Sequence, residues 1–269
     1  MPEGLEAEIW RRAAQPIVGR RIDDVWFDER VGPAGLDATL TGATIEAVDR
    51  VGKVVRILTD GGTLGLHLGM TGRIEIDGAA PIERLEYASG ADRPEWDRLV
   101  LRTQPGRKVE GAPGVDAPAV RMNDPRRLGR LSLDEPMDLG PDLLTLTTAE
   151  LRRAIERRTA AIKTVLLDQR AIAGLGNLCA DEVLFWAGVE PGRAADEVTA
   201  PELRAIARAC RSKLPAMLEA GGSTHGVLSP ELRSAPGACP LDGAALRRTT
   251  IGARTAVWCP AHQCRTPAT

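Results

Sequence analysis

The first residues that could carry out chemistry stand at the start of the chain, Met1-Pro2-Glu3-Gly4. Removal of the methionine would expose Pro2 as a secondary α-amine with a pKa of ~7.7–8.0, against ~10.4 for a lysine. Such an amine can attack C1′ of a sugar, expel the base and form an iminium. Glu3 and Glu6 are close enough in sequence to assist the proton transfers. An N-terminal proline is weak evidence by itself, so other features must support this chemistry.

Two positions in the first half of the chain could contact a phosphate or fill a gap between bases. Lys53 follows Gly52 at the start of an expected strand, where its ammonium could hold a phosphate or act as an acid. A solvated lysine at a strand end is the simpler interpretation. Met70 is expected at a hairpin tip between Gly69 and Gly72, where a flexible apolar side chain could replace an extruded base. A core methionine is an equally good interpretation.

The run Asn123-Asp124-Pro125-Arg126-Arg127-Leu128 predicts a turn that presents two guanidiniums beside an apolar side chain. Arginine in a turn can grip a phosphate or enter a vacancy between stacked bases. Arg126 and Arg127 are therefore candidate nucleic-acid contacts, with an ordinary polar turn as the alternative.

Two glycines flank Leu175 in Ala173-Gly174-Leu175-Gly176-Asn177, directly before an expected helix. Backbone N–H groups at that helix start could converge on one phosphate together with Asn177 and Lys163. A glycine-rich connection between helices, with Asn177 as the N-cap, explains the same residues.

Four residues near the C-terminus have the spacing of metal ligands. Cys239 and Asp242, then Cys259 and His262, are each separated by two residues, and 16 residues lie between the two pairs. This spacing is typical of a four-ligand zinc hairpin, in which oxygen and nitrogen ligands are acceptable although aspartate is uncommon. Cys264 is close enough to replace one ligand. The sequence therefore predicts one structural Zn²⁺ ion.

The elements that must position these residues change along the chain. Residues 5–15 have a helical stripe, and residues 22–133 contain short apolar runs broken by turns, typical of an antiparallel sandwich or barrel. Residues 106–118 are expected to form a long loop. Helical periods follow at about 148–158, 160–170, 176–187 and 200–220, with Thr148 as an N-cap. Residues 248–258 alternate as a hairpin that turns at Gly252.

Composition restricts the class of protein. The 269 residues carry a net charge of −2, which does not indicate a nucleic-acid binder, although the residues after Leu232 are locally basic. Because there is no apolar run long enough for a membrane span and no leader at the N-terminus, we expect a cytoplasmic protein with no membrane contact. The five cysteines, three of them in the last 31 residues, favour a metal site over a disulfide framework.

Taken in order, these segments resemble the formamidopyrimidine-DNA glycosylase/endonuclease VIII family from Pro2 to His262. The resemblance implies an α+β multidomain fold. Its expected parts are a catalytic β-sandwich domain with a flanking helix (1–136), a helix–two-turns–helix DNA-binding domain (137–228) and a zinc-ribbon-like β-hairpin (229–269).

The same resemblance implies a base-excision-repair glycosylase with lyase activity by β,δ-elimination. Pro2 would be the nucleophile and Glu3 the general acid/base, with Glu6 as a helper. The expected partner is double-stranded DNA containing damaged bases, bound by a monomer. Four residues would hold phosphates, two would fill the void left by the extruded base, and one would lie near the backbone: Lys53, Lys163, Asn177 and Arg254; Met70 and Arg126; and Arg127.

The chain departs from the family pattern in ways that bear on the substrate. Asp242 and His262 stand where the family usually has cysteines, and Leu128 stands where one branch has an aromatic wedge. Only sixteen residues join Gly222 to Cys239, where oxidised-purine specialists have a longer loop over the flipped base. We therefore expect a roomier pocket that favours oxidised pyrimidines, ring-opened purines, abasic sites or bulkier adducts over 8-oxoguanine.

Two other classes of function remain open at the level of sequence. A DNA-binding member of the family without catalysis would keep the helical element and the zinc hairpin, but it would have no use for Pro2, Glu3 and Lys53 together. A zinc ribbon that binds another protein is favoured only by the nearly neutral overall charge.

Overall fold

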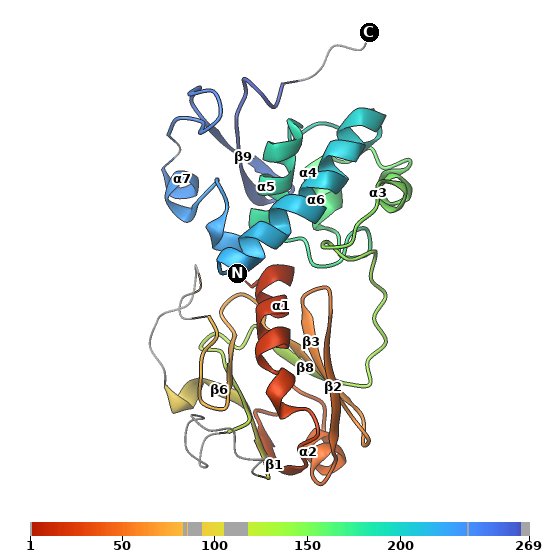
Figure 1. Cartoon of the computed structure of the whole chain (residues 1–269), viewed down its shortest axis with the longest axis vertical. Coiled ribbons are helices and arrows are strands. Elements are labelled where there is room, and N and C mark those ends of the chain that lie inside the picture. The colour runs from red at the N-terminus through yellow and green to blue at the C-terminus, as the bar shows by residue number, and fades with distance from the viewer. Residues whose placement is uncertain (1, 83–84, 86–92, 105–117, 236, 265–269) are drawn as a thin grey trace. The chain divides into compact units, whose positions relative to one another are not determined.

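The computed structural model describes residues 2–82, 85, 93–104, 118–235 and 237–264 (Figure 1). The expected loop at 106–118 lies, except for Pro118, outside the described residues. The chain divides into two compact units, of which the first contains residues 1–2 and 6–137 and the second contains residues 3–5 and 138–269. The helical segment and the C-terminal hairpin thus belong to one unit. No helix in the described ranges is long and apolar enough to cross a bilayer.

The first unit contains two antiparallel sheets of four strands each, which confirms the predicted β-rich half. In spatial order, one sheet consists of β1 (Ile22–Phe27), β6 (Asp97–Thr103), β7 (Val120–Asn123) and β5 (Arg73–Ile76). The other consists of β2 (Ile45–Val51), β3 (Val54–Thr59), β4 (Thr63–His67) and β8 (Arg130–Leu133). The helical segments of this unit are η1 (Gln15–Ile17), α2 (Leu36–Leu40), η2 (Pro94–Trp96) and α1 (Gly4–Ala13), whose first two residues are assigned to the second unit.

Alternating apolar side chains explain why these segments form a sandwich with a core. Ile57 of β3 and Leu99 of β6 are buried in one cluster of apolar side chains, and Trp10 of α1 is fully buried in the same cluster. Side chains of a strand alternate between its two faces, so each sheet turns one apolar face to the core. Because tryptophan has the largest apolar side chain, burial of Trp10 contributes strongly to holding α1 in place.

The second unit is helical up to its C-terminal hairpin. It contains α3 (Thr148–Ile155), α4 (Ile162–Leu167), α5 (Asn177–Ala187), η3 (Ala195–Glu197), α6 (Ala200–Ala220), η4 (Ser223–His225), α7 (Pro230–Ser234), β9 (Arg247–Ile251) and β10 (Arg254–Trp258). The cap of α3 is Thr147, one residue before the predicted position, and Thr147 and Glu150 form a reciprocal capping box. The short helix α7 was not predicted.

The C-terminal hairpin turns where the sequence places it. Gly252 and Ala253 both have positive φ, 54° and 59°, as a two-residue type I′ turn requires. The prediction for Met70, in contrast, needs correction. Met70 does not lie at a hairpin tip, because β4 and β5 belong to different sheets and the turn between them passes from one sheet to the other.

Candidate functional site

The carboxylate of Glu3 lies at the N-terminus of α5 and is fully buried. It accepts hydrogen bonds from the backbone N–H groups of Gly176 (3.0 Å), Leu178 (2.8 Å) and Cys179 (3.1 Å). The first N–H groups of a helix have no partner within the helix and favour a negative charge. Glu3 therefore caps a helix more than 170 residues away in sequence, which fixes the orientation of its carboxylate.

Two glycines allow this close approach. A Cβ atom on Gly176 would overlap the Glu3 carboxylate, and a Cβ on Gly4 would lie 2.8 Å from Leu143 and 2.9 Å from the carbonyl oxygen of Gly174. The N–H of Gly4 donates to that same carbonyl at 2.9 Å. Gly4 and Gly176 are thus needed because a side chain at either position would collide with these neighbours. This is a reason for their presence beyond turn formation.

The other candidates for proton transfer or catalysis have different environments. Pro2, directly before Glu3 in the chain, is buried, and so is Glu6 in α1. Lys53 occupies the second position of the two-residue turn between β2 and β3, after Gly52 with φ 59°. Burial, assisted by the charge of Lys53, lowers the pKa of His67.

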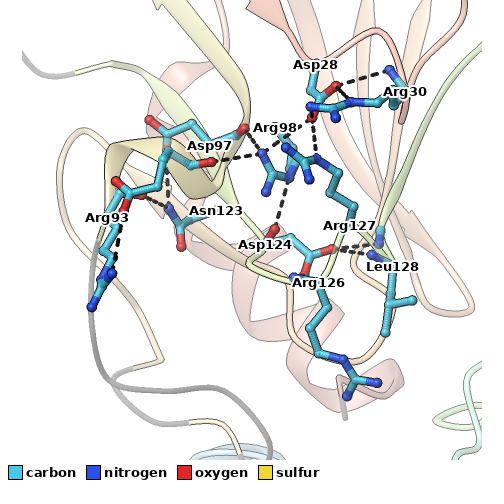
Figure 2. Close-up of polar contacts among 12 residues, drawn as sticks. Asp28, Arg30, Arg93, Asp97, Arg98, Asn123, Asp124, Arg126, Arg127 and Leu128 are labelled. Carbon is cyan, nitrogen blue, oxygen red and sulfur yellow. Dashed lines mark hydrogen bonds and ion pairs between the residues drawn. The ribbon is translucent and has the colours of Figure 1, made fainter.

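A loop formed by residues 124–129 carries the two predicted arginines, and a buried carboxylate organises it (Figure 2). Asp124 accepts hydrogen bonds from the N–H groups of Leu128 (2.7 Å) and Gly129 (2.8 Å). Its other oxygen accepts from the hydroxyl of Thr71 at 2.5 Å. Thr71 directly follows Met70, so this contact brings the two predicted void-filling segments together.

The side chains of that loop face different surroundings. Arg126 is exposed and, within the described residues, makes no side-chain hydrogen bond or ion pair, and Leu128 is 44% exposed. Figure 2 shows both side chains pointing away from the polar cluster. Arg127 is also exposed, but its guanidinium is engaged, since it donates from Nε to Asp28 at 2.8 Å. The loop thus presents one unpaired guanidinium and one apolar side chain.

Lys163 is not where a phosphate could reach it, and this expectation is corrected. Its side chain is fully buried, with Nζ 2.7 Å from Asp181 Oδ1 and donating to the carbonyl of Thr255. Burial lowers the pKa of Lys163, and Asp181 opposes the shift. Arg233 pairs with the other oxygen of Asp181 at 2.6 Å. Lys163 therefore joins α4 to α5 and β10 as an interior residue.

Asn177 and Arg254 are the remaining predicted contacts. Asn177 is the first residue of α5 rather than its N-cap, since Gly176 holds that position and Glu3 supplies the cap. Its Oδ1 is buried with no hydrogen-bond partner in the part of the chain that the structure describes. Arg254 is exposed at the start of β10. Capping thus does not consume the Asn177 amide, and Arg254 projects from the hairpin.

The four predicted metal ligands form a cluster. The ligand atoms of Cys239, Asp242, Cys259 and His262 all lie within 4.8 Å of one another. Individual separations are 3.6 Å from Cys239 Sγ to His262 Nδ1 and 3.3 Å from Cys259 Sγ to Asp242 Oδ2. Tetrahedral zinc with bonds of about 2.0–2.3 Å needs ligand atoms roughly 3.3–3.8 Å apart. The donor set and its spacing therefore fit such an ion.

A second layer of contacts fixes the orientation of two of these ligands. Nε2 of His262 lies 3.0 Å from the carbonyl oxygen of Phe185, and Nδ1 is the ring nitrogen that faces Cys239 in the cluster. Oδ1 of Asp242 accepts from the N–H of Ala244 at 2.9 Å. Cys264 is exposed and outside the cluster. Of the two residues that the sequence left open, Asp242 belongs to the cluster and Cys264 does not.

Comparison with known proteins assigns the chain to a family. Residues 1–131 match the model of the formamidopyrimidine-DNA glycosylase N-terminal domain, and residues 139–229 match the model of the formamidopyrimidine-DNA glycosylase H2TH domain. The chain belongs to the formamidopyrimidine-DNA glycosylase family. Members of this family are DNA glycosylases with lyase activity at abasic sites, so the chain is an enzyme of that class.

Relatives and solved structures match this chain over nearly its full length. Formamidopyrimidine-DNA glycosylases of Rhizorhabdus wittichii and Paracoccus denitrificans are 35% and 33% identical, covering 98% of this chain and 100% of their own. The crystal structure of the Fpg (MutM) protein of Thermus thermophilus has a TM-score of 0.77 at 29% identity, with 99% and 100% covered. A Lactococcus lactis Fpg mutant in complex with Fapy-dG-containing DNA has a TM-score of 0.78 at 23% identity and 98% and 100% coverage, which shows a shared fold.

Sequence reasoning missed several residues that organise these sites. Asp28 and Arg98 were not singled out, although both are buried and charged. Thr71 was seen only as part of a glycine-rich run, and Asp181 and Glu182 only as part of a helix. A signal existed for α7, because Ser229-Pro230-Glu231 has the cap and first-turn residues of a helix start, and Ser229 is its N-cap.

Proposed function

We propose that this enzyme excises damaged bases from double-stranded DNA and nicks the strand, with Pro2 of the mature chain as the nucleophile. The observation that carries the proposal is the fixation of the residue next to Pro2: three backbone N–H groups hold Glu3 at the start of α5. Holding a reactive group in one geometry is a large part of catalysis, and here the holding is done by main chain.

The proposed chemistry balances without any external oxidant or reductant. The Pro2 nitrogen forms a bond to C1′ while the bond from C1′ to the damaged base breaks, and the base leaves with a proton. Ring opening gives an iminium, which acidifies the C2′ protons. Loss of one of these protons expels the 3′ phosphate, a second elimination expels the 5′ phosphate, and water finally releases the amine. Glu3 is the proposed proton carrier and Glu6 its helper.

The proposed DNA contacts come from both units. Lys53, Asn177 and Arg254 are assigned to phosphates, while Met70 and Arg126 are assigned to the vacancy left by the extruded base. The exposure of Arg126 and the absence of an ion partner for it among the described residues support that assignment. Arg127 lies beside Arg126 in the loop and is assigned a supporting position near the strand.

The proposed substrates are oxidised pyrimidines, ring-opened purines, abasic sites and bulkier adducts, with 8-oxoguanine processed poorly. Support comes from the short segment between α6 and the hairpin, which is bonded to its own unit. The N–H of Leu228 donates to buried Glu182, and Arg233 of α7 pairs with buried Asp181. A segment held at both points has little freedom to close over a base.

The proposed metal is one structural Zn²⁺ ion held by Cys239, Asp242, Cys259 and His262. The ion would supply cross-linking of the β9–β10 hairpin to the segment before it, and no step of the reaction depends on it. A mixed Cys₂AspHis set keeps two thiolates, the donors that zinc prefers in structural sites.

The test is a panel of duplexes incubated with the enzyme and borohydride, which reduces an iminium to a permanent crosslink. We expect crosslinks with the abasic site and with oxidised pyrimidines, and slow release of 8-oxoguanine. An enzyme that binds these duplexes without crosslinking or cleaving any of them would instead be a catalytically silent member of the family. Excision of 8-oxoguanine faster than the other lesions would refute the proposed substrate preference alone.

A further inference from the structure

The carboxylate of Asp28, in the segment after β1, lies at the centre of a group of arginines (Figure 2). It accepts from Arg30 Nε at 2.8 Å and from Arg127 Nε at 2.8 Å, and Arg98 NH1 lies 3.4 Å away. The side chain of Asp28 is 8% exposed. Hydrogen bonds from Arg30 and then Arg127 hold the pKa of Asp28 well below its usual range, so it is charged at neutral pH.

Asp28 reaches the loop of residues 124–129 by two routes. The first is direct, through the guanidinium of Arg127. The second passes through Arg98, which is almost fully buried and donates from Nε to the carbonyl oxygen of Asp124 at 2.9 Å. The Asp28 carboxylate therefore contacts a side chain of the loop directly. It is linked to the main chain of the loop indirectly, through Arg98.

The conformation of the loop explains why it needs such an anchor. Arg127 has φ 51°, a left-handed backbone conformation that residues other than glycine rarely adopt. Surrounding contacts must therefore hold it. Asp124 bonds the N–H groups of Arg126, Leu128 and Gly129, which leaves the Arg127 side chain to be fixed by Asp28.

The consequence concerns the neighbours of Arg127. With Arg127 turned toward Asp28, Arg126 and Leu128 are the side chains of the loop that point away from the cluster (Figure 2). We propose that Asp28 is a positioning residue for base extrusion: by holding Arg127 and Arg98 it keeps Arg126 and Leu128 in the orientation that fills the vacated space. This inference rests on the proposed function, because it presumes that the loop enters damaged DNA.

The test compares Asp28→Asn with wild type on two duplexes under single-turnover conditions. One contains dihydrouracil, whose base must be extruded, and the other a preformed abasic site, which has no base to extrude. A 2-aminopurine beside the lesion reports unstacking by its fluorescence. We expect dihydrouracil excision to slow about tenfold with a smaller fluorescence rise, and abasic-site cleavage to change less than about twofold.

Two further variants are controls. Arg30→Gln removes a guanidinium from the same carboxylate but leaves the contact with Arg127, so both rates should match wild type. Asp28→Glu keeps the charge and should restore most of the excision rate. Melting temperatures of all variants show whether the unit is folded.

Three results overturn the proposal: an unchanged Asp28→Asn enzyme, an equal loss on both duplexes, or an Arg30→Gln loss as large as that of Asp28→Asn. Failure of the proposed function looks different, because wild type itself would then cleave neither duplex. The fluorescence of bound duplex would still report whether Asp28→Asn alters unstacking.

Discussion

Asp28 and Glu182 are both buried carboxyl groups that anchor a loop, one in each unit, and their surroundings are opposite. Asp28 is paired with arginines, which hold its pKa well below the usual range. Glu182, 1% exposed, accepts one backbone hydrogen bond from Leu228, and burial raises its pKa to about 7. Burial alone does not decide whether such a carboxyl group is ionised. The hydrogen-bond donors that face it lower its pKa and can outweigh the effect of burial.

Glu3 provides a third case, in which main-chain donors replace the arginines. Three of its partners are backbone N–H groups whose positions are fixed by the start of α5. The three carboxyls therefore form a series: Glu3 is held by main-chain donors, Asp28 by guanidiniums, and Glu182 is buried with its pKa raised. Each member can be tested separately.

The largest effect should come from disturbing the main-chain clamp. Gly176→Ala places a methyl group where the Glu3 carboxylate lies, although the backbone of Gly176 is extended and accepts any residue. We expect incision of an abasic-site duplex to fall about 100-fold, about 2.7 kcal/mol in activation free energy, because a reactive group displaced by an ångström loses that much. Gly192→Ala, where a Cβ has room, is the matched control. Wild-type rates for Gly176→Ala would show that the clamp is not needed.

The protonation-dependent anchor predicts a pH dependence of stability. The pKa of Glu182 is raised from 4.5 to about 7, so the folded state binds the proton more tightly than the unfolded state does. Its contribution to stability is full below pH 4.5 and is lost as the pH rises through 7. Between pH 5 and 8 this group should lower the free energy of unfolding by roughly 2–3 kcal/mol.

Glu182→Gln keeps an acceptor for the N–H of Leu228 and cannot ionise. We expect it to be more stable than wild type at pH 8 and to lose that part of the pH dependence, as measured by urea unfolding at several pH values. Glu156→Gln, at an exposed position of the same unit, is the control. Parallel stability curves for wild type and Glu182→Gln would contradict the raised pKa.

The smallest effect concerns Asp242, the proposed oxygen ligand of the candidate metal cluster. Asp242→Cys replaces a carboxylate with a thiolate, a softer ligand that structural zinc sites prefer. We expect zinc affinity to rise about tenfold in a competition with a chromogenic chelator. A lower affinity would contradict the proposal that these four residues surround one zinc ion at bonding distance.

Local pattern was sufficient for most of the elements and for part of the site. Strands, the long helix α6 and the hairpin turn follow from periodicity and from Gly252, and the clustering of the four candidate metal ligands follows from spacing. These features depend on residues close together in the chain. Boundaries such as that of α4, expected at about 160–170 and observed at Ile162–Leu167, were less well predicted.

The rest depended on partners far apart in sequence. Lys163 has the residue type of a phosphate ligand, and its burial against Asp181 could not be known before the packing of α4 on α5. Asn177 has the residue type of an N-cap, yet a glutamate at position 3 takes that role. Asp28 and Arg127 are 99 residues apart, and no local pattern joins them. A charged residue that becomes buried needs an ion-pair or hydrogen-bond partner, but the sequence does not identify that partner.

If the amine of residue 2 is the nucleophile, peptide mapping of the crosslinked complex will find the sugar attached there. The enzyme is trapped on an abasic-site duplex with borohydride, digested with nuclease and protease, and analysed by mass spectrometry. We expect the sugar adduct on a peptide that begins at Pro2, with the methionine removed. An adduct on a lysine such as Lys53, or full activity of a chain that retains Met1, would contradict it.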